Sequence, residues 1–453
     1  MNSVSSVCKE VLKKIKPDEN EDKKVKDIAH RVLDVLEDMG HETVVVGSIG
    51  KHTWLSGDHD IDIFVLFPKD VSRENLEKKG LEIGREVCKR MKAKPVMKYA
   101  EHPYTRAVVK GYGIDIVPCY KIGQGERIIS AVDRSPLHLK YVLENLKPEQ
   151  RDEVRLLKQF MKGADVYGSD VKHNAFSGYV CELLIIIYGT FEEVLRQILH
   201  WRYPQNIDMD PKQAKRLQGA LFLRDPVDIN RNTAAAISIE KLISFISVSR
   251  EFLSNPDDSV FFPMLAKLSG VQFNKLKKRE SYFLALKAKR PDMINDTLFP
   301  QLRKATQRLE RMLMHEDFET LKTVEYADNN IIVILFEFDH EQLPAIKQMI
   351  GPSVNSKGHS EEFLTKYKNP EFGPYILDKT WCVEIKRKYR RPEELLKSFF
   401  AGDDLEQKGI AKDLIKPLKN AKILKGKSVW PLIKRNKKLS DFVRRRYFDS
   451  VRI

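Results

Sequence analysis

Residues 44–67 read VVVGSIGKHTWLSGDHDIDIFVLF. The second apolar run of this stretch carries two acids, Asp60 and Asp62. Side chains two apart in a β-strand point to the same face, so these carboxylates project side by side from a strand whose opposite face is apolar. Two like charges that close repel each other, and one pKa rises, unless a cation lies between them. Because Mg²⁺ takes oxygen ligands from carboxylates and from substrate phosphates, the stretch predicts a magnesium site on a strand.

A third acid interrupts another apolar run, where residues 113–120 read GIDIVPCY and place Asp115 between two isoleucines. A two-metal phosphoryl-transfer site uses such a carboxylate to bind the metal ion that activates the attacking hydroxyl. If the two strands are neighbours, the three carboxylates converge on one edge of a sheet. We therefore expect all three acids to be catalytic and to bind metal.

Two other interpretations of these acids compete with a metal site. Aspartates near the end of a strand often cap a turn. Asp58, Asp60 and Asp62 also have the alternating spacing of an EF-hand loop, but Ile63 stands where that loop requires glycine. The pair Gly47-Ser48, which eleven residues separate from Asp60, favours phosphate chemistry. A Gly-Ser turn after a strand can offer backbone N–H groups and a hydroxyl to a phosphate.

Hydrophobic periodicity divides the chain into three parts and predicts an α+β protein. Residues 1–145 alternate short β-forming runs with helical patterns, which predicts a small mixed sheet with helices. Residues 146–257 are mostly helical, and residues 258–453 mix strands and helices. The strands expected in the first part are 43–46, 61–67, 96–99, 105–110 and 114–119.

The net charge of +15 over 453 residues favours a polyanionic partner. Residues 408–453 hold 15 Lys and Arg against three Asp, which is +12 of that total. A solvated basic tail would explain this run. However, four aromatic residues are interleaved with the cations, which favours a folded, basic nucleic-acid surface. They are Trp430, Phe442, Tyr447 and Phe448.

The five cysteines lie far apart without a CxxC pair, which suits a reducing cytoplasm and predicts neither a zinc site nor a disulfide framework. Residues 1–19 carry charges where a signal peptide has its apolar core. The densest apolar run, 180–188, is interrupted by Glu182 and is too short to span a bilayer. We expect a soluble cytoplasmic protein that does not enter a membrane.

With these motifs, the chain resembles the nucleotidyltransferase superfamily typified by DNA polymerase β, and more closely the archaeal (class I) CCA-adding enzymes, which are tRNA nucleotidyltransferases. The Gly-Ser turn with the three acids is specific only to the superfamily. The closer resemblance rests on further segments of residues 98–302, namely KYAEHPYTRAVVKG, IDIVPCYKI, SAVDRSPLHLKY, EVRLLKQFMK, VYGSD, FSGYVCELLI, DPVDINRNTAAAIS and RPDMINDTLFPQL.

The resemblance implies a polymerase β-like nucleotidyltransferase head at 1–145, a helical neck for nucleotide and base recognition at 146–257, and an α+β body and tail at 258–453. The head acids would bind two Mg²⁺ ions. The reaction would attach C, C and A to the 3′ end of tRNA from CTP and ATP, without a template and with release of pyrophosphate. The body and tail would bind the acceptor stem and elbow of tRNA, and a homodimer is possible.

By the same resemblance, nine residues would bind the nucleotide. Arg231 would contact the incoming base, and Asp228 could orient its guanidinium or form a simple surface pair with it. Many relatives carry arginine in place of Lys51, so a bidentate grip on phosphate would become a point charge. The nine residues are Gly47, Ser48, Lys51, His102, Ser135, His138, Lys158, Tyr167 and Arg231.

Two alternatives remain open. A poly(A) polymerase or another terminal nucleotidyltransferase could use the same head on another RNA and would not stop after three nucleotides. A non-catalytic tRNA- or RNA-binding protein could retain the acids without using them.

Overall fold

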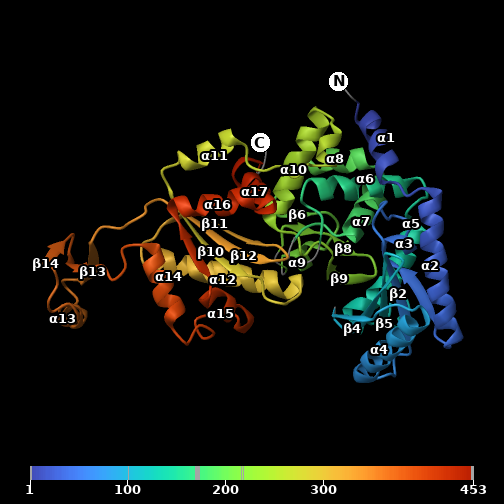
Figure 1. The fold of residues 1–453 in the computed structure, drawn as a ribbon, viewed down its shortest axis with the longest axis horizontal. Helices are drawn as coiled ribbons and strands as arrows, with labels where there is room; N and C mark the ends of the chain where they lie inside the picture. The colour runs from blue at the N-terminus through green and yellow to red at the C-terminus, as the bar shows by residue number, and fades with distance from the viewer. Residues whose placement is uncertain (1–2, 100, 169–173, 216, 218, 450–453) are drawn as a thin grey trace. The chain divides into compact units, whose positions relative to one another are not determined.

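The computed structural model describes residues 3–99, 101–168, 174–215, 217 and 219–449, so Ser169 and Asp170 of the VYGSD segment lie outside the described residues. The chain divides into two compact units between Met264 and Leu265. Both combine helices and sheets (Figure 1), and the expected α+β class is confirmed. In the described residues, no helix is both long and apolar enough to cross a bilayer.

A five-stranded sheet in the order β1-β2-β5-β4-β3 forms the centre of the head. Strands β2 and β5 are parallel, and the other neighbouring pairs are antiparallel. All five strands expected from the sequence are present. Their bounds are β1 (Thr43–Val46), β2 (Asp60–Phe67), β3 (Val96–Tyr99), β4 (Pro103–Val109) and β5 (Tyr112–Tyr120).

Helices α2 (Glu19–Asp38) and α4 (Arg73–Arg90) cover one face of this sheet. Each begins at a side-chain cap, since Asp18 and Ser72 accept hydrogen bonds from the first-turn amides. Ile61 and Ile63 of β2 are fully buried against this layer, as the alternation of the strand predicts. The acids of the quoted stretch therefore lie on the opposite face, beside a smaller apolar cluster that includes Leu139.

The rest of the first unit is mainly helical and packs around an aromatic core. Phe160, Phe191, Phe252 and Phe261 meet with ring centroids 5.3 to 5.9 Å apart. The larger helices are α1 (Val4–Ile15), α5 (Arg134–Asn145), α6 (Gln150–Gly163), α7 (Gly178–Tyr188), α8 (Phe191–Ile198) and α10 (Ile239–Ser254). The short elements are α3 (Gly47–Gly50), α9 (Pro211–Ala214), β6 (Gln205–Asn206), β7 (Leu221–Phe222), β8 (Arg224–Asp225) and β9 (Asp228–Asn232).

The second unit is built on an antiparallel sheet in the order β11-β12-β10-β16. Its strands are β10 (Tyr282–Lys289), β11 (Thr320–Ala327), β12 (Ile331–Phe338) and β16 (Lys422–Lys425). One face packs on α12 (Asn295–His315), α14 (Pro392–Ala401) and α15 (Lys412–Lys419), and the other on α11 (Gly270–Lys277), α16 (Val429–Arg435) and α17 (Lys437–Arg444). The four aromatic residues of the basic C-terminal segment pack against this second face. The described part of the basic segment is therefore folded rather than a solvated tail.

A second, three-stranded sheet belongs to the same unit and projects from it with one helix (Figure 1). Its order is β13-β15-β14. The elements are β13 (Ile346–Ser353), α13 (Lys357–Lys366), β14 (Phe372–Leu377) and β15 (Thr380–Lys386).

Candidate active site

The parallel register of β2 and β5 brings the three acids to one face of the sheet. Asp62 lies directly opposite Asp115, and Asp60 lies opposite Gly113. Burial raises the pKa of Asp62 to about 6, and the neighbouring charges of Asp115 and Asp60 add to this effect. Burial also raises the pKa of Asp115. The acids thus form the repelling group that the sequence predicts.

An arginine that the sequence analysis missed lies among these acids. Arg106 of β4 donates from Nη1 to both carboxylate oxygens of Asp115, at 3.0 and 3.2 Å, and from Nη2 to Asp60. In the described part of the chain, no group of three or more His, Cys, Asp or Glu side chains is arranged to hold a metal ion. Nevertheless, the donors fit Mg²⁺, because carboxylate oxygens are its preferred ligands and a divalent cation would relieve the repulsion that raises the pKa of Asp62.

The turn after β1 lies against the same acids. Gly47 has a φ of +66°, and a Cβ at this position would clash with Oδ2 of Asp62. Glycine is therefore required both for the left-handed backbone and for the close approach. Ser48 follows it and is half-buried. The structure thus places the Gly-Ser turn next to Asp62.

Lys51 and Lys158, both expected to bind phosphate, meet at a carboxylate that the sequence analysis did not assign a role. The Nζ atoms of Lys51 and Lys158 lie 2.8 and 2.9 Å from Oε2 and Oε1 of Glu182. Thr53 donates to Glu182 at 2.7 Å and accepts from Lys158 at 2.8 Å. Burial alone would raise the pKa of Glu182, but the two lysines outweigh it and lower the pKa to about 2. The one feature of the sequence that points to Glu182 is that it interrupts the apolar run 180–188.

Tyr167 lies close to this network. A Cβ on Gly178, at the start of α7, would come within 2.9 Å of the Tyr167 hydroxyl and 3.3 Å of Cε of Lys158. Burial raises the pKa of Tyr167, so its hydroxyl stays protonated. The structure therefore brings three of the expected nucleotide-binding residues, Lys51, Lys158 and Tyr167, into one region of the first unit.

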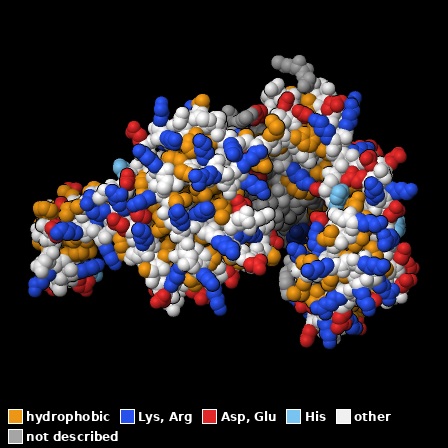
Figure 2. Space-filling model, viewed as in Figure 1, with side chains coloured by type: hydrophobic (Ala, Val, Ile, Leu, Met, Phe, Trp, Pro, Cys, Tyr) orange, Lys and Arg blue, Asp and Glu red, His pale blue; other side chains and the backbone are white. Residues whose placement is uncertain are grey.

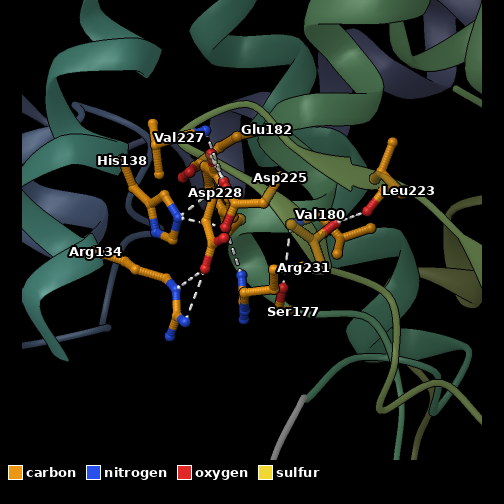
Figure 3. A network of polar contacts seen from close by, with 12 residues as sticks. Arg134, His138, Ser177, Val180, Glu182, Leu223, Asp225, Val227, Asp228 and Arg231 are labelled. Atoms are coloured by element: carbon orange, nitrogen blue, oxygen red, sulfur yellow. Dashed lines mark hydrogen bonds and ion pairs between the residues drawn. The ribbon is translucent and has the colours of Figure 1, made fainter. Parts of the chain in front are cut away.

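A second polar network surrounds the buried Asp225 (Figure 3). The Oδ2 atom of Asp225 lies 2.8 Å from Nη1 of Arg231 and 2.9 Å from Nε2 of His138. The His138 ring stacks on Tyr179, with ring centroids 3.8 Å apart. Burial lowers the pKa of His138, although Asp225 opposes this effect. Burial would raise the pKa of Asp225, but its bonds to His138 and Arg231 lower it.

The suggestion that Asp228 orients Arg231 is wrong. Asp228 pairs instead with Arg134 of α5, at 2.8 Å, and Asp225 takes the place beside Arg231 (Figure 3). The reason is the tight β8–β9 ribbon, in which Asp225 and Asp228 are paired at the turn while Arg231 lies further along β9. Sequence proximity alone did not distinguish the two acids.

The two remaining expected residues have weaker connections to these networks. Ser135 is half-buried in the first turn of α5, three residues before His138. His102 is 1% exposed, and its Nδ1 lies 3.3 Å from Glu77 of α4, the helix on the sheet face opposite the acids. Among the described residues, its Nε2 has no hydrogen-bond partner. The structure does not connect His102 to the acids or to the lysines.

The sequence matches three family models in order along the chain. They are the nucleotidyltransferase domain at residues 25–138, the second domain of tRNA nucleotidyltransferase at 152–262, and the C-terminal domain of CCA-adding enzyme at 279–426. Among solved structures, Cid1 poly(U) polymerase aligns with a TM-score of 0.45 at 15% identity, over 57% of this chain and 97% of that one. That likeness is too distant to assign a substrate.

Three relatives are similar over most of their length. The chain is 38% identical to the CCA-adding enzyme of Methanocaldococcus jannaschii, over 88% of this chain and 92% of that protein. It is 39% identical to that of Methanosarcina acetivorans, over 86% and 87%, and 35% identical to that of Archaeoglobus fulgidus, over 87% and 89%. At this identity and coverage, the chain belongs to the CCA-adding enzymes, a family of tRNA nucleotidyltransferases.

Proposed function

We propose that this enzyme adds C, C and A in turn to the 3′ end of tRNA from CTP and ATP, without a nucleic-acid template and with release of pyrophosphate. The structural observation that best supports this chemistry is the register of β2 and β5, which sets Asp62 opposite Asp115 beside the Gly47 turn. Carboxylates and a phosphate-binding turn on one sheet face are the elements that nucleotidyl transfer requires.

Asp60, Asp62 and Asp115 would hold two Mg²⁺ ions, which when bound would acidify the 3′-hydroxyl of the RNA and neutralise charge on the triphosphate. The remaining work is positioning, because an in-line attack on an α-phosphate needs little covalent help from the protein. Ser48, next to Gly47, offers a hydroxyl and a backbone N–H to the phosphates on the same side as the acids.

Lys51, Lys158 and Tyr167 would bind the triphosphate. Lys51 donates to Glu182 and keeps further N–H donors for a ligand. The three N–H donors of Lys158 meet Glu182 and the hydroxyl and carbonyl oxygens of Thr53, so a phosphate would displace one of these contacts. Glu182 keeps both lysines in place between turnovers. With the ionised Glu182, the two lysines therefore present one net positive charge to a substrate that carries about four negative charges.

Arg231 would read the incoming base while Asp225 holds its guanidinium. The Arg231 side chain is 38% exposed although Asp225 is fully buried, so the arginine is anchored at one end and accessible at the other. A cavity of about 440 Å³ lies beside it, lined also by Ser177 and Thr233. His138 and the adjoining Ser135 of α5 would support this site from the head side.

The acceptor stem and elbow of tRNA would bind to the second unit. Figure 2 shows Lys and Arg side chains over the visible face of this unit. Two hollows, of about 780 and 1130 Å³, are rich in such side chains. RNA duplexes are bound mainly through phosphates and 2′-hydroxyls, so a charged surface of matching shape suffices. The cations of the two hollows are Lys267, Lys277, Lys287, Lys422, Lys427, Lys434, Arg435, Lys437 and Lys438.

We extend the proposal to the organisation of the protein. Residues 1–145 would act as the catalytic head, 146–257 as the nucleotide-recognising neck, and 258–453 as the RNA-binding body and tail. A cytoplasmic location suits an enzyme of tRNA processing. A homodimer would be revealed by light scattering of the purified chain.

A tRNA transcript that lacks its last three nucleotides tests the function. It is incubated with labelled CTP and ATP, separately and together, with Mg²⁺ present or chelated. We expect two C residues from CTP alone, then one A and arrest when both are present, and no addition without the metal ion. An unending A tail would indicate a poly(A) polymerase, UTP incorporation another terminal transferase, and tRNA binding without addition a non-catalytic protein.

A further inference from the structure

Arg106 lies among the acids, and the chemistry described above assigns it no role. Its position follows from the sheet, because β4 pairs with β5 so that Arg106 is directly opposite Asp115. Asp62 lies on the other side of Asp115 in the same row across the sheet. Directly opposite residues share a face, so the guanidinium projects on the face that carries the acids.

The guanidinium binds two of the three carboxylates at once. Its Nη1 reaches both oxygens of Asp115, at 3.0 and 3.2 Å, and its Nη2 reaches Asp60. This arrangement requires glycine at position 113, because a Cβ on Gly113 would clash with both Nη2 of Arg106 and Oδ1 of Asp60. The pair is thus built into three neighbouring strands rather than formed by chance between surface side chains.

Arg106 and a divalent cation need the same oxygen atoms. Both oxygens of Asp115 already accept from Nη1, and a second positive charge a few ångströms from the guanidinium would be repelled by it. The two cations therefore compete for these carboxylates. Space for the arginine to leave is present, since Val96 and Val108 flank it on the same face and are 44% and 58% exposed.

We propose that Arg106 is a positioning residue that acts as the counterion of Asp60 and Asp115 when no divalent cation is bound, and that it leaves both carboxylates when the cation binds. The proposal rests on the proposed function, because it takes these acids to be the metal ligands. Arg106 then weakens the repulsion among the acids in the free enzyme. It also lowers the affinity of the site for the metal ion.

Mn²⁺ binding to the full chain, without nucleotide or RNA, tests the proposal by electron paramagnetic resonance of the free ion. Arg106→Met should bind Mn²⁺ about tenfold more tightly than the wild type, because the competing cation is gone. Arg85→Met is the matched control, since it removes the same charge from an exposed position on α4, and its affinity should change less than about twofold.

Thermal unfolding gives a second readout. In EDTA, Arg106→Met should unfold at a lower temperature than the wild type, and saturating Mn²⁺ should raise its Tm more than that of the wild type. If Arg106→Met does not fold, Arg106→Gln serves in both measurements. Unchanged or weaker Mn²⁺ binding by the folded variant would overturn the proposal.

Asp62→Asn separates this result from a failure of the proposed function. If the wild type does not bind Mn²⁺, or if Asp62→Asn leaves its Mn²⁺ binding unchanged, the assignment of the acids as metal ligands is wrong. If that binding is present but insensitive to Arg106, only the role of the arginine is wrong.

Discussion

Replacing Glu182 by glutamine removes the negative charge that pairs with Lys51 and Lys158 in the interior of the first unit. Glu182 is 1% exposed, and the two lysines are 7% and 3% exposed. Glutamine keeps the shape and one acceptor oxygen, but its amide nitrogen would face one of the ammonium groups. The change therefore leaves two buried positive charges without their counterion.

The magnitude follows from two independent routes. The pKa of Glu182 falls from 4.5 to about 2 on folding, which corresponds to about 3 kcal/mol in the free energy of unfolding. Removing one partner of a buried ion pair typically costs about 3–5 kcal/mol. We therefore expect Glu182→Gln to destabilise the first unit by about 3–4 kcal/mol, which lowers Tm by about 6–16 °C for a unit of this size.

Hydrogen exchange of the amides in α6 and α7 measures this effect where it arises, since these helices carry Lys158 and Glu182. The matched control is Glu192→Gln on α8. Glu192 forms an exposed pair with Arg196 one turn away, so its loss should cost less than about 1 kcal/mol.

The pH dependence has a defined sign. A carboxyl group whose pKa is lowered on folding contributes stability above its unfolded pKa and loses it as the pH falls through the folded pKa. The difference between wild type and Glu182→Gln should be full above pH 4.5 and vanish as the pH falls toward about 2. A Glu182→Gln protein within about 1 kcal/mol of the wild type at pH 7, like the control, would refute the reasoning.

Three further predictions concern the site. Asp62→Asn should reduce CMP incorporation at least about a hundredfold while filter binding of tRNA is unchanged, and a loss of both would contradict its role as a metal ligand. The pKa of Asp62 is raised to about 6, so CMP incorporation at limiting Mg²⁺ should fall as the pH drops from 7 to 5. Saturating Mg²⁺ should move this fall to lower pH. A pH profile that does not change with the Mg²⁺ concentration would argue against Asp62 as a metal ligand. Asp225→Asn should raise KM for both CTP and ATP about tenfold or more, because Arg231 loses a charge-assisted partner. Steady-state kinetics with each nucleotide measures this effect, and a rise in KM for only one of them would contradict the prediction.

Much of the head could be predicted from local patterns. The five strands follow from short β-forming runs bounded by turn residues, and they are found within a few residues of the expected bounds. The side-by-side placement of Asp60 and Asp62 follows from the two-residue period of a strand, which also buries Ile61 and Ile63 on the other face. These are properties of consecutive residues, so one stretch of sequence determines them.

The partners of the charged residues could not be predicted in the same way. Arg106 meets Asp115 only because β4 and β5 pair in one register, and Glu182 meets Lys51 across 131 residues of chain. Asp225 rather than Asp228 binds Arg231 because of how the β8–β9 ribbon turns. In each case, several acidic or basic residues with similar sequence surroundings could have formed the pair, so the sequence does not identify the partner.

By itself, then, the sequence determined the strands, the face on which the acids of β2 point, and the family to which the chain belongs, because periodicity and motif spacing are local. Only the tertiary structure decided which strands are neighbours, in which register they pair, and which buried carboxylate compensates which cation. The physical reason is burial. An unpaired charge in the interior is strongly destabilising, so each buried charge pairs with whichever counterion the fold brings close to it.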